Sequence, residues 1–91
     1  MKQKIILDKD ILFKDGKEIH LTEKEIIALR TLQDNLLHTK IELIKNMRIK
    51  RSLNENRTLS LHLLRLNTKT RLKTKPLKGA GYYLEDRIFV I

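Results

Sequence analysis

The clearest hydrophobic pattern in the chain lies within residues 56–72. When this segment is plotted at 100° per residue, Leu59, Leu63 and Leu66 fall within about 60° of each other. The opposite side, about 140° wide, carries Arg57, Thr58, Leu61, His62, Arg65 and Lys69. The pattern predicts an amphipathic helix with a core face and a basic face. Such a helix fits the major groove of DNA, although basic residues also serve simply to solubilise an exposed helix face.

The segment that follows predicts a basic β-hairpin. Lys73, Lys75 and Lys78 lead into the turn 79–81, whose two glycines allow the positive φ of a tight turn. The next residues, 82–84, are strand formers. A basic helix followed by a basic hairpin is the layout of a winged helix-turn-helix.

Near the N-terminus, short apolar runs alternate with charged turns. The runs 5–7, 11–13 and 19–21 predict two or three strands, and Asp15-Gly16 is a typical type I′ hairpin turn. We therefore expect a small antiparallel sheet over residues 4–21 that packs on the helices.

A helix is predicted to begin after Thr22. The Thr22 hydroxyl and the Glu25 carboxylate have the spacing of a capping box, and Leu21 and Ile26 have that of a hydrophobic staple. The helix is expected to continue to about residues 34–35, with an inward stripe of Ile26, Leu29 and Leu32.

A second, shorter helix is predicted over Lys40 to Met47. Thr39 and Glu42 repeat the capping-box spacing. The residues expected to face inward are Ile41, Ile44 and Met47. A loop over residues 48–55 follows, in which Asn54 (or Asn56 just beyond) caps the third helix. The basic residues of this loop either contact phosphates or are simply solvated: Arg48, Lys50 and Arg51.

Charge is segregated along the chain. Residues 1–36 hold seven basic and seven acidic side chains, whereas residues 37–91 hold thirteen basic and four acidic ones. The whole net charge of +9 therefore belongs to the C-terminal part. Such segregation creates a field that attracts a polyanion with salt-sensitive affinity.

Composition narrows the class of protein. A length of 91 residues predicts one domain, 1–91, and the absence of cysteine excludes disulfides and thiolate metal sites. No long apolar run or signal peptide is evident, so a soluble cytoplasmic protein is expected, with no membrane partner. The three histidines lie on separate elements, and no catalytic constellation has workable spacing. We expect no enzymatic activity, no cofactor and no metal site.

Three motifs together resemble the effector domain of OmpR/PhoB-type response regulators. The segment 21–25 (LTEKE) is similar to that family's L-T-x-x-E helix opening. The segment 56–66 (NRTLSLHLLRL) is similar to its D/N-R-T-V-D-V-H-I-x-R-L helix, and 78–84 (KGAGYYL) to its R-G-x-G-Y-x-L wing. The resemblance implies an α+β winged helix-turn-helix: a small N-terminal antiparallel sheet (4–21), three helices (22–72) and a C-terminal β-hairpin wing (73–86).

The resemblance also implies roles on double-stranded DNA. Phosphates would be held by Arg57, Thr58 and His62, while Arg65 would read base edges, where an arginine pairs bidentately with guanine. Leu61 would lie against a thymine methyl or a sugar. With the residues of the basic face and the wing included, the candidate DNA-binding residues are Arg57, Thr58, Leu61, His62, Arg65, Lys69, Lys78 and Tyr82.

Within this set, the wing residues have their own implied contacts. Lys78 would enter or border the minor groove, and the Tyr82 hydroxyl would reach a phosphate. The chain departs from the family at Leu64 and Asn67, which stand where basic residues are usual, and at Pro76, which confines its strand to an edge or a kink. The apolar tail 87–91 would extend the last strand or bind a partner.

Two further partners follow from the resemblance. Relatives sit head to tail on direct repeats, which implies a tandem homodimer on DNA, and their loop after the second helix recruits RNA polymerase. No receiver domain is present among these residues. The favoured function is sequence-specific DNA binding by a transcription regulator. The alternatives are a basic RNA-binding or ribosome-associated domain, and a winged-helix module that binds protein.

Overall fold

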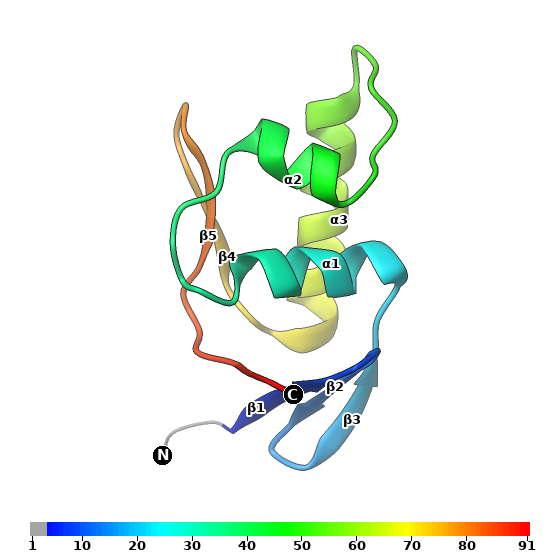
Figure 1. Ribbon diagram of the computed structural model, residues 1–91, viewed down its shortest axis with the longest axis vertical. Coiled ribbons are helices and arrows are strands. Elements are labelled where there is room, and N and C mark those ends of the chain that lie inside the picture. The colour runs from blue at the N-terminus through cyan, green and yellow to red at the C-terminus, as the bar shows by residue number, and fades with distance from the viewer. Residues whose placement is uncertain (1–3) are drawn as a thin grey trace.

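The computed structural model describes residues 4–91; residues 1–3 of the expected domain lie outside the described part. The elements follow the expected order (Figure 1). They are β1 (Ile5–Asp8), β2 (Ile11–Lys14), β3 (Lys17–His20), α1 (Glu23–Leu32), α2 (Lys40–Asn46), α3 (Glu55–Thr70), β4 (Thr74–Leu77), β5 (Gly81–Leu84) and β6 (Phe89–Val90). The expected winged-helix architecture, with an α+β composition, is confirmed.

The N-terminal sheet lies at one end of the elongated molecule, with strand order β3-β2-β1-β6 (Figure 1). Strands β1, β2 and β3 form two antiparallel hairpins, as expected. At the second turn Asp15 and Gly16 have φ values of 52° and 82°, the positive values that a type I′ turn requires. The hairpin prediction made from Asp15-Gly16 is therefore confirmed.

The C-terminal tail returns to the first strand. β6 pairs in parallel with β1, with Ile6 opposite Phe89 and Leu7 opposite Val90, and the Ile91 N–H donates to the Leu7 carbonyl at 2.9 Å. The expectation that the tail extends the last strand of the wing is therefore wrong. The exposed edge of β1 offered unpaired backbone groups, and the tail satisfies them.

The three helices bury the predicted leucines in one core. Leu29 and Leu32 of α1 are fully buried and Ile26 nearly so. Helix α1 ends at Leu32, slightly before the expected 34–35. Just beyond its C-cap Asn35 takes a φ of 61° and donates from its amide to the carbonyls of Leu84 and Asp86. Asparagine tolerates this left-handed conformation, so the chain turns there.

Helix α2 is rotated from its predicted orientation. Ile44 and Met47 are buried as expected, but Ile41 is 65% exposed and Leu43 is buried in its place. A helix of seven residues has too few apolar positions to define its inward side by periodicity. Packing against α1 and α3 sets its rotation instead.

The C-terminal hairpin consists of β4 and β5, which pair with each other alone among the described strands. Pro76 lies on β4 opposite Tyr82, and because β4 is an edge strand its missing N–H leaves no ladder partner unsatisfied, as the sequence predicted. The turn is closed by a hydrogen bond of 2.9 Å from the Ala80 N–H to the Leu77 carbonyl, with Gly79 at a φ of 78°. We call β4, β5 and the turn 78–80 the wing.

Candidate nucleic-acid interface

Helix α3 presents a broad outer face. Its inner side is held by Leu59, Leu63 and Leu66, whose side chains are at most 2% exposed, so the predicted core stripe is confirmed. The opposite residues, at roughly 340° to 80° on a helical wheel that starts at Arg57, are all exposed. We call this set the outer face of α3: Arg57, Leu61, Leu64, Arg65 and Thr68.

The two ends of α3 are capped differently. Asn54 is the N-cap residue, as expected, although its side chain makes no capping hydrogen bond. At the other end Arg71 has a φ of 59° and its N–H donates to the Asn67 carbonyl at 2.7 Å. The preceding loop is found where predicted, and one of its three arginine and lysine side chains, Arg51, pairs with Glu55 at 2.7 Å.

The wing is bonded to α3 at two points. The hydroxyls of Ser60 and Tyr82 are 3.0 Å apart. Lower down, the Asn67 side-chain oxygen accepts from the N–H and the hydroxyl of Thr74, at 3.0 and 2.9 Å. In the sequence, Asn67 was notable only because the family usually has a basic residue there. In the structure it holds Thr74, the first residue of the wing. These hydrogen bonds join the helix to the wing, which lies to the left of α3 in Figure 1.

A third attachment connects the wing to the segment between α1 and α2. The backbones of His38 and Tyr82 exchange two hydrogen bonds of 2.9 Å as an isolated antiparallel bridge. Gly81 makes this approach possible, because a Cβ built there would lie 1.9 Å from the His38 carbonyl oxygen. No side chain fits at that position without moving the backbone.

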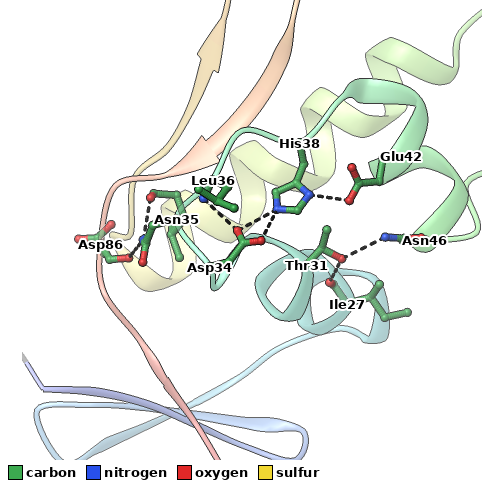
Figure 2. A network of polar contacts seen from close by, with 10 residues as sticks. Ile27, Thr31, Asp34, Asn35, Leu36, His38, Glu42, Asn46 and Asp86 are labelled. Atoms are coloured by element: carbon green, nitrogen blue, oxygen red, sulfur yellow. Dashed lines mark hydrogen bonds and ion pairs between the residues drawn. The ribbon is translucent and has the colours of Figure 1, made fainter.

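The His38 side chain reinforces this attachment (Figure 2). Its ring lies between two carboxylates, with Nε2 at 2.8 Å from Asp34 and Nδ1 at 2.5 Å from Glu42. Burial lowers the pKa of His38, but the hydrogen bonds to Asp34 and Glu42 outweigh it and leave that pKa above its ordinary value. The imidazole thus connects the end of α1 to the first turn of α2.

Lys69 has an internal partner. Its ammonium lies 2.7 Å from a carboxylate oxygen of Glu25, a residue that is only 1% exposed. Burial raises the pKa of Glu25, but the hydrogen bonds from Lys69 and from the Thr22 N–H and hydroxyl prevail and lower it. The other Glu25 oxygen, Oε2, has no hydrogen-bond partner. Lys69 therefore neutralises a buried carboxylate, and its ammonium is tied to α1.

His62 lies in a shallow groove that α1 and α3 line together, with Arg65 and Lys69 beside it. Burial, followed by the charges of Lys24 and Arg65, lowers the pKa of His62 below its ordinary value. This shift favours the neutral imidazole, which can donate one hydrogen bond.

The structure separates the eight sequence-predicted site residues into three groups. Arg57, Leu61 and Arg65 are exposed on the outer face, and Thr58 and His62 are half-buried along its flank. Lys78 is exposed at the turn of the wing. Two residues are placed otherwise: Lys69, which is paired with Glu25, and Tyr82, which is 9% exposed with its hydroxyl at Ser60.

Some residues of the interface were missed by the sequence reading. Ser60, Asn67 and His38 position the wing, and Leu64 lies at the middle of the outer face. Leu64 is in register with Leu61 at i+3, a spacing visible in the sequence. Ser60 contacts Tyr82, 22 residues away, and Asn67 contacts Thr74, 7 residues away. Hydrophobic periodicity does not predict such polar contacts between different elements.

Two solved structures of similar architecture are described as DNA-binding domains. The response regulator AdeR DNA-binding domain, in complex with an intercistronic region, superposes with a TM-score of 0.80 over 94% of this chain and 98% of its own, at 20% identity. The Klebsiella pneumoniae RstA DNA-binding domain, in complex with the RstA box, gives 0.69 over 81% of each chain at 18% identity.

This chain has the winged-helix fold of OmpR/PhoB-type effector domains. A mutant of RitR also matches, with a TM-score of 0.69 and 22% identity, over 84% of this chain and 37% of that longer one. No protein-family model and no curated protein matches the sequence. At these identities the likeness establishes the fold.

Two further features are absent from residues 4–91. In that range no helix combines the length and apolar character of a bilayer-crossing segment. Nor do three or more His, Cys, Asp or Glu side chains of the described residues gather where they could hold a metal ion.

Proposed function

We propose that this chain is a sequence-specific double-stranded DNA-binding domain of a transcription regulator acting in the cytoplasm. The outer face of α3 enters the major groove, where Arg65 reads base edges. Arg57, Thr58 and His62 contact phosphates beside it, and Lys78 of the wing contacts the adjacent backbone or minor groove. The outer face of α3 fits the major groove of B-DNA, which is wide enough to admit one helix.

One observation carries this proposal: hydrogen bonds join the outer face of α3 to the wing, and both surfaces carry basic side chains that have no ion-pair partner among residues 4–91. Arg57 and Arg65 are exposed on the outer face, and Lys78 is exposed on the wing. Ser60–Tyr82 and Asn67–Thr74 fix the distance between these two surfaces. A rigid pair of basic surfaces favours a ligand of regular shape, because a preformed site loses little entropy on binding.

The placement of Lys69 and Tyr82 changes their proposed roles. Lys69 supports the outer face through Glu25. Tyr82 still has a proton to give to a phosphate if the Ser60 hydroxyl donates to the tyrosine oxygen, since either hydroxyl can be the donor. We therefore keep both in the proposed interface, Lys69 at its border and Tyr82 as a link between wing and helix.

The partner is proposed to be duplex DNA in preference to RNA. The major groove of A-form RNA is too deep and narrow for side chains to read, whereas a helix lies readily in the major groove of B-DNA. The chain also has few aromatic residues, 4%, on which single-stranded bases would stack. Tandem binding on direct repeats and contact with RNA polymerase are further proposals from the same resemblance.

The test is selection of bound sequences from a random duplex pool, followed by affinity measurements at several salt concentrations. We expect an enriched motif whose preference over random duplex persists as salt rises, while non-specific binding is lost. A repeated half-site would support tandem binding. An equal affinity for every duplex, or a preference for RNA of the same sequence, contradicts the proposal.

Two substitutions separate base reading from backbone contact. Arg65→Ala should cost about 1–3 kcal/mol at one base position and relax the preference there. Lys78→Ala should weaken binding to all duplexes alike and lower the salt slope by about one. The matched controls are Arg87→Ala and Lys17→Ala, both exposed residues near the N-terminal sheet; neither should change the preferred sequence.

A further inference from the structure

The middle of the outer face of α3 is apolar. Leu61 is 43% exposed and Leu64 is 60% exposed, although both stand among arginines. Residues three apart on a helix are neighbours, with about 5–6 Å between their Cβ atoms. The two leucines therefore form one continuous apolar surface, with Arg57 and Arg65 beside it.

Thr68 extends this surface by one turn. Its hydroxyl donates to the Leu64 carbonyl at 2.9 Å, so the polar end of the side chain is engaged with the helix itself. The methyl group is what remains to contact a partner. We call Leu61, Leu64 and the Thr68 methyl the apolar strip.

The surroundings of the strip define the chemistry of its partner. A strip set among positive charges suits a surface that is anionic overall and carries isolated apolar groups. The major groove of DNA has this character, because every thymine presents a C5-methyl group there between two phosphate backbones. RNA lacks that methyl. A protein partner would need an apolar patch inside an acidic ring.

The family resemblance already implies a thymine methyl or a sugar at Leu61; we infer that Leu64, as a further specificity-determining residue of the apolar strip, reads a thymine methyl group on a neighbouring base pair. Along α3 the two leucines are separated by about 4.5 Å of helix rise, close to the spacing of about 3.4 Å between successive base pairs. The preferred site thus contains adjacent thymines next to the base pair that Arg65 reads. This inference rests on the proposed function.

The decisive experiment removes only the methyl group. The tightest duplex selected from a random pool is resynthesised with deoxyuridine in place of one thymine at a time, which keeps base pairing and every hydrogen-bonding group. Losing one methyl contact should weaken binding by about fourfold at each position that touches the strip. Thymines elsewhere in the site should tolerate the exchange.

Variants assign the effect to individual side chains. Leu64→Ala should bind thymine and deoxyuridine duplexes equally at one position, and Leu61→Ala should do so at a neighbouring one. Both residues are exposed, and alanine is a strong helix former, so both variants should fold. Leu53→Ala is the control, because Leu53 is fully exposed in the loop before α3 and should leave discrimination intact.

The outcomes distinguish this inference from the proposed function. If the wild type binds a selected duplex but treats thymine and deoxyuridine alike at every position, the thymine reading is wrong and DNA binding stands; the strip then belongs to a protein contact. If no duplex is preferred at all, the proposed function fails and the inference fails with it.

Discussion

The first turns of α1 and α2 start from the same Thr-x-x-Glu motif and end in different structures. At α1 the capping box is complete, with the Glu25 N–H donating to the Thr22 hydroxyl at 3.3 Å and the Thr22 N–H to Glu25 at 2.9 Å. At α2 only the first half forms: the Glu42 N–H donates to the Thr39 hydroxyl at 3.1 Å. The Glu42 carboxylate turns to His38 instead.

The residue before the cap and the degree of burial explain the difference. Leu21 precedes Thr22 and has no polar group to offer, and Lys69 approaches Glu25 from α3. His38 precedes Thr39 and presents a ring nitrogen to Glu42, whose side chain is 43% exposed. The glutamate at the start of α1 is therefore buried against α3, whereas the glutamate at the start of α2 contacts His38, which is bonded to the wing. The same motif serves the fold in one place and the candidate interface in the other.

The attachment of α2 to the wing should be the most sensitive point. Gly81→Ala should destabilise the protein by about 3 kcal/mol, since the new Cβ meets the His38 carbonyl and the φ of 152° is strained for alanine. Urea unfolding measures the loss. Gly79→Ala is the control: its φ is also positive but the space is open, so about 1 kcal/mol is expected. Similar losses at both glycines would show that the bridge to His38 is unimportant.

Next in size, the two glutamates should differ in their contribution to stability. Glu25→Ala should cost about 2 kcal/mol, because the Thr22 N–H and the Lys69 ammonium lose their buried acceptor. Glu42→Ala should cost less than about 1 kcal/mol, because the Glu42 side chain is 43% exposed. Both are read from urea midpoints. Equal losses would mean that burial does not distinguish the two helix starts.

A double-mutant cycle tests the two halves of each box. Thr22→Ala and Thr39→Ala should each cost about 1 kcal/mol as lost N-caps. Thr22 and Glu25 should show a coupling of about 0.5–1 kcal/mol, because each accepts from the other's backbone. Thr39 and Glu42 should be additive. Coupling at the second pair would indicate that Glu42 leaves His38 in solution and closes the box.

The smallest effect should be a pH dependence at His38. Its pKa is raised above the ordinary 6.5, so its contribution to stability is complete below about pH 6.5 and is lost as the pH rises through the higher folded value. Burial raises the pKa of Asp34, but its hydrogen bond to His38 prevails and lowers that pKa below the ordinary 3.8. The contribution of Asp34 to stability is therefore complete above pH 3.8 and is lost in acid. Together Asp34 and His38 stabilise the protein most between pH 3.8 and pH 6.5.

His38→Gln gives the measurement for this window. Relative to the variant, the wild type should be more stable at pH 6 than at pH 8 by less than about 1 kcal/mol, since both carboxylates are partly exposed. His20→Gln, at an exposed position on β3, is measured alongside as the matched substitution. Parallel profiles for wild type and His38→Gln would exclude the charged cluster.

Much of the fold was predictable because its signals are local. The Asp15-Gly16 turn, the Thr22 cap and the leucine stripe of α3 each depend on residues within a few positions of each other. The outer face of α3 was predictable for the same reason, since helix periodicity places Arg57 and Arg65 opposite the buried leucines.

The sequence was least informative where distant segments meet or a signal is short. Ile41 was predicted to face inward because α2 is brief, and extension of the last strand was one of two alternatives for the tail, which pairs with β1 instead. The partner of Lys69 was not predictable because Glu25 is 44 residues away. The contact of the Tyr82 hydroxyl with Ser60, 22 residues away, was not predictable for the same reason.

By itself the sequence determined the order of the elements, the core side of α3 and the location of the positive charge, because turns, caps and periodicity act through neighbouring residues. The tertiary structure alone decided which polar groups remain free for a partner. Burial makes an unpaired charge or hydroxyl costly, so Glu25, Asn67 and Tyr82 take partners from whichever segment the fold brings near. Among the described residues, Arg57 and Arg65 have no such partner and remain exposed on α3.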